Sequence, residues 1–221
     1  LTSASVDTNT MGILSADQIL NTKWPDPVWA VPGLLPVGLT ILAGAPKIGK
    51  SWLSLQIAKA ISSGGEFLGQ KVEKGPVMIF ALEDTPQRLQ SRMNAMGWPA
   101  NLNVDFLTIP RTGEQGWSML NGGGEKLAVL MKQKGYRLVV IDTLSRAIPG
   151  DQQDVQAMTR ALTPLQEMAH QVNCALVIND HHRKAGAVNS DVIADILGST
   201  AKGAMADTIW SLYRERGKNG A

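Results

Sequence analysis

The chain has 221 residues, of which 44% are hydrophobic, 18% charged and 5% aromatic, and its formal net charge is +2. These values are close to the globular average and predict one α/β domain, and they exclude intrinsic disorder, collagen and a disulfide scaffold. So small a charge does not by itself indicate nucleic-acid binding, and any such site must come from a local basic patch.

Residues 1–28 are predicted to form an N-terminal arm ahead of a core over residues 29–221. Residues 1–23 are polar and rich in small side chains, and Trp24-Pro25-Asp26-Pro27 resists helix because proline restricts both itself and the residue before it. The chain starts at Leu1 without an initiator Met and stops at Ala221 just after a polar stretch. We therefore expect a fragment of a longer protein, with the core truncated at its C-terminus.

No run of the sequence approaches the roughly 18 consecutive apolar residues that a membrane-spanning helix needs. The first residues lack the basic start and the apolar segment of a signal peptide. We expect a cytoplasmic protein without membrane contact.

From Gly38 onward, short apolar runs rich in strand-forming residues alternate with segments of helical period. This alternation predicts a mainly parallel, twisted sheet with helices on both faces. The six predicted strands are Leu39–Ala43, Val77–Leu82, Val104–Ile109, Leu138–Ile141, Ala175–Ile178 and Thr208–Tyr213.

Apolar spacing predicts the helices between these strands. From Asp154 to Val172 apolar residues recur at steps of three and four, which places one apolar stripe on the sheet, and Pro164 is expected to kink this helix. Lys50–Ile61 is the second predicted helix.

Thr85–Met96 is the third, with Thr85 as its N-cap and Pro86 at its first position. Gly122–Gly124 is predicted to be a loop. Cys174 lies beside an apolar run, which favours a buried, inert thiol.

A phosphate-binding loop is the strongest motif. Residues 44–51 have the spacing G-x-x-x-x-G-K-S between a predicted strand and a predicted helix, where backbone N–H groups can wrap phosphates in front of the positive helix end. Lys50 supplies a charge to the outer phosphates, and Ser51 a hydroxyl to magnesium. The predicted nucleotide-binding residues are Gly44, Ala45, Pro46, Lys47, Ile48, Gly49, Lys50, Ser51 and the adjoining Trp52.

Two further strands end in acids, at the sheet edge where α/β proteins bind ligands. Asp142 ends one of them and is the expected second magnesium partner, with Thr143 as a candidate to share that site. Val77–Leu82 ends in Glu83 and Asp84, either of which has the carboxylate that a hydrolase needs to activate water. We favour Glu83, because Asp84 is also a candidate cap for the helix that begins near Thr85.

The strand Ala175–Ile178 runs into Asn179-Asp180-His181-His182-Arg183-Lys184. The vicinal histidines lack a further Cys or His at ligand spacing, since the third histidine, His170, belongs to the preceding helix, so we discount zinc. A polar residue at this strand tip can sense a terminal phosphate by hydrogen bonding. Arg183 and Lys184 open a small-residue loop suited to a polyanion.

Together these motifs resemble the RecA-like ATPases, specifically the RepA-type hexameric replicative helicases and their "AAA family ATPase" relatives. The resemblance runs from about Trp29 to Arg216, and its marks occur in the family's order. They are Gly38–Leu55, Val77–Asp84, Val139–Asp142, His181–Lys184 and Leu197–Asp207.

The resemblance implies a site for ATP and Mg²⁺ in which Lys50 and Glu83 are catalytic, Glu83 as the base, and Asp142 is the magnesium-associated acid. One of His181 and His182 is implied as the phosphate sensor, and we favour His182. It also implies a homo-oligomeric ring, a hexamer in the family's manner, in which a neighbour's arginine completes each ATP site. Arg214 and Arg216 are the candidates for that arginine finger.

The resemblance implies that the loops Ser145–Gln153 and Arg183–Asp191 face the ring channel and hold single-stranded DNA. Here that contact would rest on Arg146, Arg183 and Lys184, because neither loop contains an aromatic stacking platform. The arm around Trp24 and Trp29 resembles a segment that packs near the nucleotide or against a neighbour, and core packing of the two indoles is the alternative.

Two functions follow from the sequence. The first is an ATP-driven motor on single-stranded DNA, such as a RepA-like helicase or an accessory replication or recombination ATPase. The second is a nucleotide-switched assembly or signalling module that moves no DNA. A small-molecule kinase is disfavoured, since the chain lacks an obvious lid with several arginines.

Overall fold

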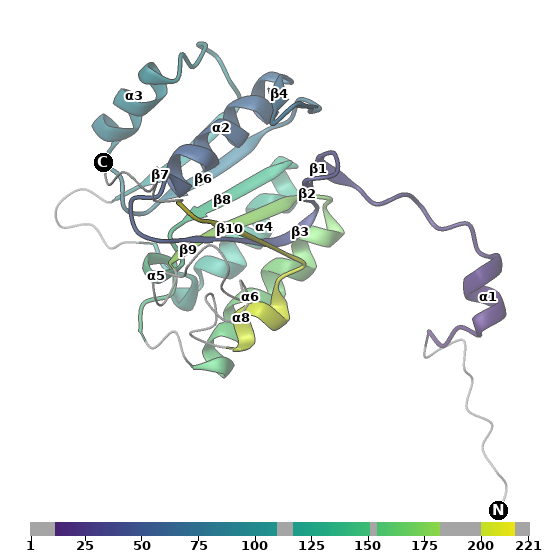
Figure 1. The fold of residues 1–221 in the computed structure, drawn as a ribbon. Coiled ribbons are helices and arrows are strands. Elements are labelled where there is room, and N and C mark those ends of the chain that lie inside the picture. The colour runs from purple at the N-terminus through teal and green to yellow at the C-terminus, as the bar shows by residue number, and fades with distance from the viewer. Residues whose placement is uncertain (1–11, 110–116, 151–153, 182–199, 215–221) are drawn as a thin grey trace, which may run out of the picture.

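The computed structural model describes residues 12–109, 117–150, 154–181 and 200–214. Their centre is a six-stranded sheet in the order β10-β3-β9-β8-β6-β7, in which every neighbouring pair is parallel (Figure 1). All six predicted strands are present and the predicted parallel sheet is confirmed. The strands are β3 (Gly38–Gly44), β6 (Val77–Ala81), β7 (Val104–Thr108), β8 (Leu138–Asp142), β9 (Ala175–His181) and β10 (Thr208–Leu212).

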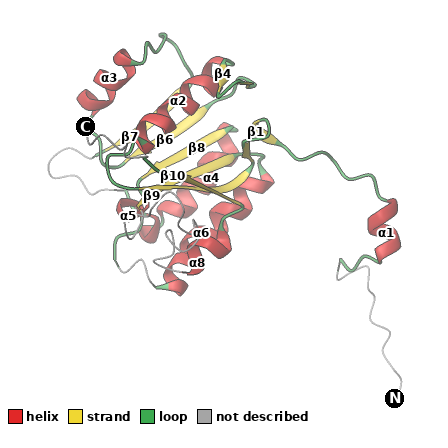
Figure 2. Ribbon diagram, viewed as in Figure 1, coloured by secondary structure: helices red, strands yellow, loops and turns green. Residues whose placement is uncertain are grey.

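Helices cover both faces of the sheet, as expected (Figures 1 and 2). One face carries α2 (Lys50–Ser63) and α3 (Pro86–Ala95). The other carries the 3-10 turn η1 (Met119–Asn121), α4 (Gly123–Lys134), α5 (Leu144–Ala147), α6 (Val155–Gln171) and α8 (Thr200–Met205). The described part of the chain has no helix of the length and apolar character that a bilayer span requires.

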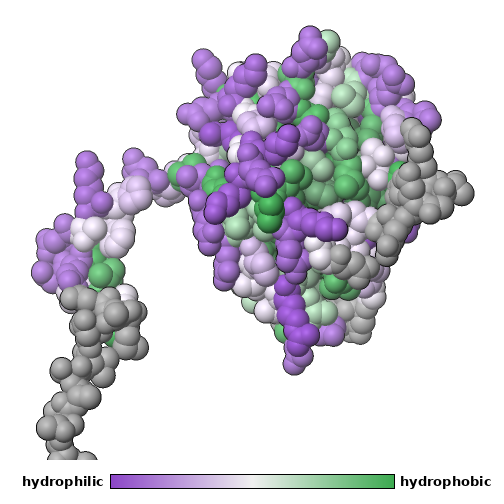
Figure 3. All heavy atoms as spheres, turned by 180° about the vertical axis from the view of Figure 1, so that it is seen from behind, coloured by the Kyte–Doolittle hydropathy of each residue, from purple (hydrophilic) through white to green (hydrophobic). Residues whose placement is uncertain are grey.

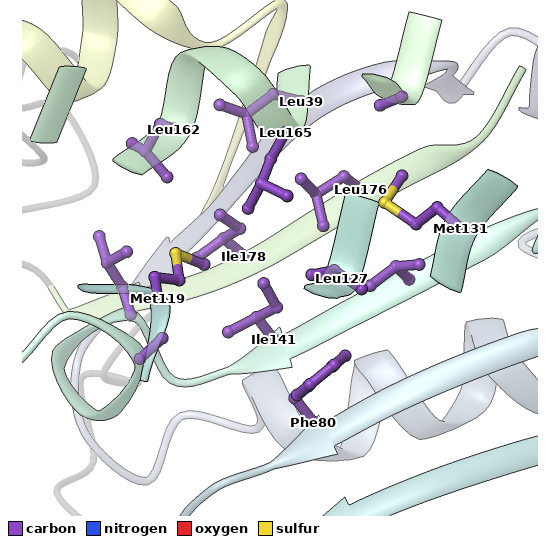
Figure 4. Close-up of a cluster of buried hydrophobic side chains, with 14 of the residues drawn as sticks. Leu39, Phe80, Met119, Leu127, Met131, Ile141, Leu162, Leu165, Leu176 and Ile178 are labelled. Carbon is purple, nitrogen blue, oxygen red and sulfur yellow. The ribbon is translucent and has the colours of Figure 1, made fainter. Parts of the chain in front are cut away.

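Two cores result because successive residues of a strand face opposite sides of the sheet. In β8, Val139 and Ile141 pack towards α4 and α6, whereas Leu138 and Val140 pack towards α2. Figure 4 shows the first core, where leucines and methionines of the helices meet Leu176 and Ile178 of β9. Cys174 is fully buried in this core, as predicted.

The predicted helices α2, α3 and α6 are all present. Thr85 is the N-cap of α3 and Pro86 its first residue, as predicted, and the Thr85 hydroxyl accepts a hydrogen bond from the Arg88 N–H at 3.3 Å. Helix α6 continues on both sides of Pro164.

The prediction of a loop at Gly122–Gly124 is wrong, because α4 begins at Gly123. The apolar residues Leu127 and Met131, both buried, hold this helix on the sheet and override the low helix propensity of glycine. A side chain at Gly123 would place its Cβ only 2.1 Å from the Ser118 carbonyl oxygen, so the close approach of these two backbones requires glycine here.

The N-terminal arm extends away from the core and contains the short helix α1 (Ala16–Asn21), which Ser15 and Gln18 cap reciprocally (Figure 1). Its Trp24 is 54% exposed and donates to the Ile19 carbonyl oxygen, so this indole is not a core residue. Two antiparallel pairs that the sequence patterns did not predict complete the fold: β1 (Trp29–Val31) with β2 (Leu35–Pro36), and β4 (Glu66–Phe67) with β5 (Gln70–Lys71).

Candidate active site

A cleft of about 330 Å³ lies at the carboxyl ends of the central strands. Strand register explains why distant residues meet there: Gly44 of β3 pairs with His181 of β9, and Asp142 of β8 pairs with Ala81 and Asn179. The cleft is lined by Lys47, Gly49, Lys50, Ser51, Trp52, Glu83, Arg88, Arg92, Asp142 and His181. The structure thus brings together the predicted phosphate loop, both predicted acids and one of the two histidines.

The phosphate loop joins β3 to α2. Gly49, the N-cap of α2, has φ of +117°, a conformation that glycine adopts without the strain another residue would meet. Helix α2 begins at Lys50, so the unpaired N–H groups of its first turn and its positive dipole end lie at the cleft. This arrangement is suited to binding phosphate groups.

The Lys50 ammonium group is buried, and three acceptors surround it. Its Nζ lies 2.8 Å from the Gly44 carbonyl oxygen, 3.1 Å from that of Ala45 and 3.2 Å from Nδ1 of His181. Because an ammonium only donates, Nδ1 of His181 accepts, and the proton of the neutral ring is on Nε2. Burial lowers the pKa of Lys50, an effect that the charges of Asp142, Asp180 and Glu83 oppose in part.

Ser51 and Asp142 line the same cleft from the first turn of α2 and the end of β8. A hydroxyl and a carboxylate oxygen suit a hard cation, so this donor set fits Mg²⁺, which would neutralise phosphate charge there. Thr143 does not share the site. It is buried outside the cleft, and its hydroxyl donates to the Asn179 carbonyl oxygen at 2.7 Å.

The two acids after β6 have different surroundings. Glu83 lines the cleft, and its carboxylate lies 3.6 Å from Nε of Arg146. Asp84 is buried and forms ion pairs with Arg88 and Arg92 of α3. Asp84 is therefore not the cap of α3, and Glu83 is the acid that can reach a ligand in the cleft.

The other predicted site residues divide by position. His181 lies in the cleft, whereas His182, Arg183, Lys184 and Arg216 lie outside the described residues. Arg146 is in α5 and exposed, next to the cleft through its contact with Glu83. Arg214 is exposed two residues beyond β10, the strand whose last residue pairs with Gly44.

Arg88 and Arg92 also line the cleft, although neither belongs to a motif named above. Arg88 follows Asp84 by four residues and Arg92 follows Arg88 by four. This spacing puts the two arginines on one side of α3, where both reach Asp84 just before the helix, and it is a signal that the sequence does contain. The guanidinium of Arg92 also lies 5.9 Å from the centre of the Trp52 ring, within the range of a cation–π contact. Trp52 and these arginines form one wall of the cleft.

The comparison with known protein families agrees with this geometry. Residues 8–187 match the family described as an AAA domain, AAA_25, whose members are RecA-like P-loop NTPases. The match covers the arm from residue 8, the phosphate loop and every strand of the sheet except β10. The chain therefore belongs to the AAA domain family and is an ATP-binding P-loop NTPase.

Proposed function

We propose that this chain is the ATP-hydrolysing subunit of a RecA-like, ring-forming motor that acts on single-stranded DNA, as RepA-type helicases do. The observation that carries the hydrolytic part is the convergence of Lys50, Glu83 and His181 on one cleft with the two magnesium-type ligands. A module that only binds nucleotide has no need of a carboxylate such as Glu83 at the open side of the phosphate loop.

The residues divide the chemistry among them. The loop N–H groups and Lys50 hold the phosphates, and Lys50 exchanges its carbonyl acceptors for phosphate oxygens. Glu83 orients the attacking water and accepts its proton. Nε2–H of His181 donates to the terminal phosphate, and an arginine of a neighbouring subunit, with Arg214 or Arg216 as candidates, stabilises the charge of the transition state.

The contact between Arg146 and Glu83 supports a link to DNA. The same arginine lies 3.6 Å from the proposed base and, within α5, belongs to the segment Ser145–Gln153 that is expected to hold single-stranded DNA. The pair is largely exposed, so a DNA phosphate can compete for the guanidinium at little free-energy cost. DNA binding would then free Glu83 to act on water, which couples the strand to hydrolysis.

Hydrolysis is tested with the two variants Lys50→Ala and Glu83→Gln. Lys50→Ala should lose both ATP affinity and turnover, whereas Glu83→Gln should keep ATP affinity and lose turnover by on the order of 100-fold or more. Steady-state phosphate release and binding of a fluorescent ATP analogue measure the two quantities. Glu83→Gln with wild-type turnover would show that Glu83 is not the base.

DNA binding is tested with the double variant Arg183→Ala/Lys184→Ala. Its matched control is Lys132→Ala/Lys134→Ala, which removes the same charge from the exposed last turn of α4. Fluorescence anisotropy at low salt should show loss of single-stranded DNA affinity in the first variant only, with ATP affinity intact in both. Equal DNA affinity in both variants would favour the nucleotide-switched module.

A further inference from the structure

A buried ion pair joins α8 to the end of β9. Nζ of Lys202 lies 2.8 Å from Oδ2 of Asp180, and the two side chains are 4% and 3% exposed. Neither residue lines the cleft. Lys202 belongs to the segment Leu197–Asp207, which is part of the family resemblance but takes no part in the chemistry described above.

The pair is connected to the phosphate site through one carboxylate. Oδ1 of Asp180 accepts the backbone N–H of His181 at 2.9 Å, while its Oδ2 accepts from Lys202. Nδ1 of His181 in turn lies 3.2 Å from Nζ of Lys50. Three consecutive contacts therefore lead from α8 to the lysine of the phosphate loop.

Stability alone is a weak reason for this arrangement. A buried ion pair adds little or nothing over apolar residues of similar size, because removing two charges from water offsets their attraction. What the pair does provide is orientation: with both oxygens of Asp180 engaged, its carboxylate cannot rotate without losing one bond. His181 is thereby fixed at the register position opposite Gly44.

We propose that Lys202 is a positioning residue that, through Asp180, holds the end of β9 so that the His181 ring stays against Lys50. This proposal rests on the proposed function for its effect on turnover, but the position of His181 is independent of it. Helix α8 leads directly into β10, so the same contact ties the segment that precedes Arg214 to the terminal-phosphate end of the cleft.

The kinetic test uses Lys202→Met and Lys202→Arg. Lys202→Met should lower kcat about tenfold or more and change the KM for ATP far less. Lys202→Arg keeps the charge and should retain most of the wild-type kcat. In a His181→Gln background, Lys202→Met should lower kcat little further, because both changes remove the same interaction. Full additivity of the two effects would overturn the proposal.

A second readout needs no turnover. The ¹⁵N signal of the His181 ring, assigned with His181→Gln, should shift when Lys50→Met removes the donor to Nδ1. Lys202→Met should reproduce that shift, and Lys134→Met on the exposed end of α4 should not. An unchanged His181 signal in folded Lys202→Met would overturn the proposal. If Lys202→Met shows the shift but the wild-type protein does not hydrolyse ATP, only the proposed function is contradicted.

Lys202→Met leaves a buried carboxylate unpaired and is therefore a candidate for misfolding. The variant Asp180→Asn/Lys202→Met removes both charges at similar volume, and its amide oxygen can still accept the His181 N–H. It should fold and still show the lowered kcat and the shifted His181 signal. Wild-type values for both in this variant would show that the pair serves folding alone.

Discussion

Lys50 is the residue whose titration reports on the phosphate site. Its pKa is lowered from the ordinary 10.5 mainly by burial, and the negative charge of bound phosphates must raise it again. ATP binding should therefore take up protons at pH values between the pKa values of the free and bound states, and ATP affinity should fall as the pH rises through that range.

Calorimetry of ATP binding in buffers of different ionisation enthalpy measures this uptake. The uptake should be absent in Lys50→Met, which also binds ATP more weakly. Proton uptake of the same size in that variant would show that a group other than Lys50 takes up the proton.

Cys174 provides a test of the core at the same scale. Burial raises the pKa of its thiol to about 12, so the thiolate is scarce at neutral pH. The native protein should not react with a thiol reagent at pH 8, and the unfolded protein should react with one equivalent, because Cys174 is the single cysteine. Fast labelling of the native state, monitored by absorbance, would contradict the burial of Cys174 in the core beneath α4 and α6.

At the scale of elements, Asp207 lies in the link between α8 and β10 and joins β3 to α6. Its carboxylate accepts the Leu39 N–H at the start of β3, at 2.7 Å, and contacts Gln166 and His170 of α6. Asp207→Ala should lower the free energy of unfolding by about 2 kcal/mol, because it leaves the buried Leu39 donor without its acceptor. Urea denaturation measures the change, and Asp17→Ala on the exposed α1 is the control, expected within about 0.5 kcal/mol of wild type.

Features of the site that depend on neighbouring residues in the chain could be predicted from the sequence. The phosphate loop and the cap at Thr85 are local strand-loop-helix and loop-helix patterns, so their residue types identify them. The neighbours of a histidine at the end of β9 could not be predicted in this way, because they depend on how β9 pairs with β3. His181 pairs with Gly44 and its Nδ1 lies 3.2 Å from Nζ of Lys50, whereas His182 lies outside the described residues.

Contacts between residues far apart in the chain could not be predicted from local sequence patterns. Asp180 and Lys202 are 22 residues apart, and their contact exists because α8, which packs on α6, brings Lys202 to the end of β9. The sequence does not predict the start of α4 at Gly123, because glycine ordinarily disfavours helix. Glycine is required there because the backbone of Ser118 lies too close for a side chain. Tertiary packing decided both features.

At the scale of the whole molecule, the N-terminal arm exposes hydrophobic side chains that the core of the same chain does not cover. Leu20 is 83% exposed, and the arm carries hydrophobic as well as hydrophilic residues away from the core (Figure 3). We propose that a second copy of the chain covers these side chains in the ring. Leu20→Glu should shift the protein towards monomer in analytical ultracentrifugation, with unchanged unfolding of the core. Identical sedimentation of the variant and wild type would exclude the arm from subunit contact.

Arg146 connects the proposed DNA contact with the proposed base. Arg146→Gln frees Glu83 from its charge partner, so ATP hydrolysis without DNA should rise about two- to fivefold, in line with the small free energy of an exposed pair. Stimulation by DNA should fall at the same time. A variant with unchanged basal hydrolysis would show that the contact does not restrain Glu83.

The most direct measurement is steady-state ATP hydrolysis at low and high salt, with and without single-stranded DNA, with Lys50→Ala as the blank. The proposed motor predicts hydrolysis above the blank that DNA stimulates at low salt and does not stimulate at high salt, because the phosphate contacts are electrostatic. Hydrolysis above the blank that is indifferent to DNA at both salt concentrations would contradict the motor and favour the nucleotide-switched module.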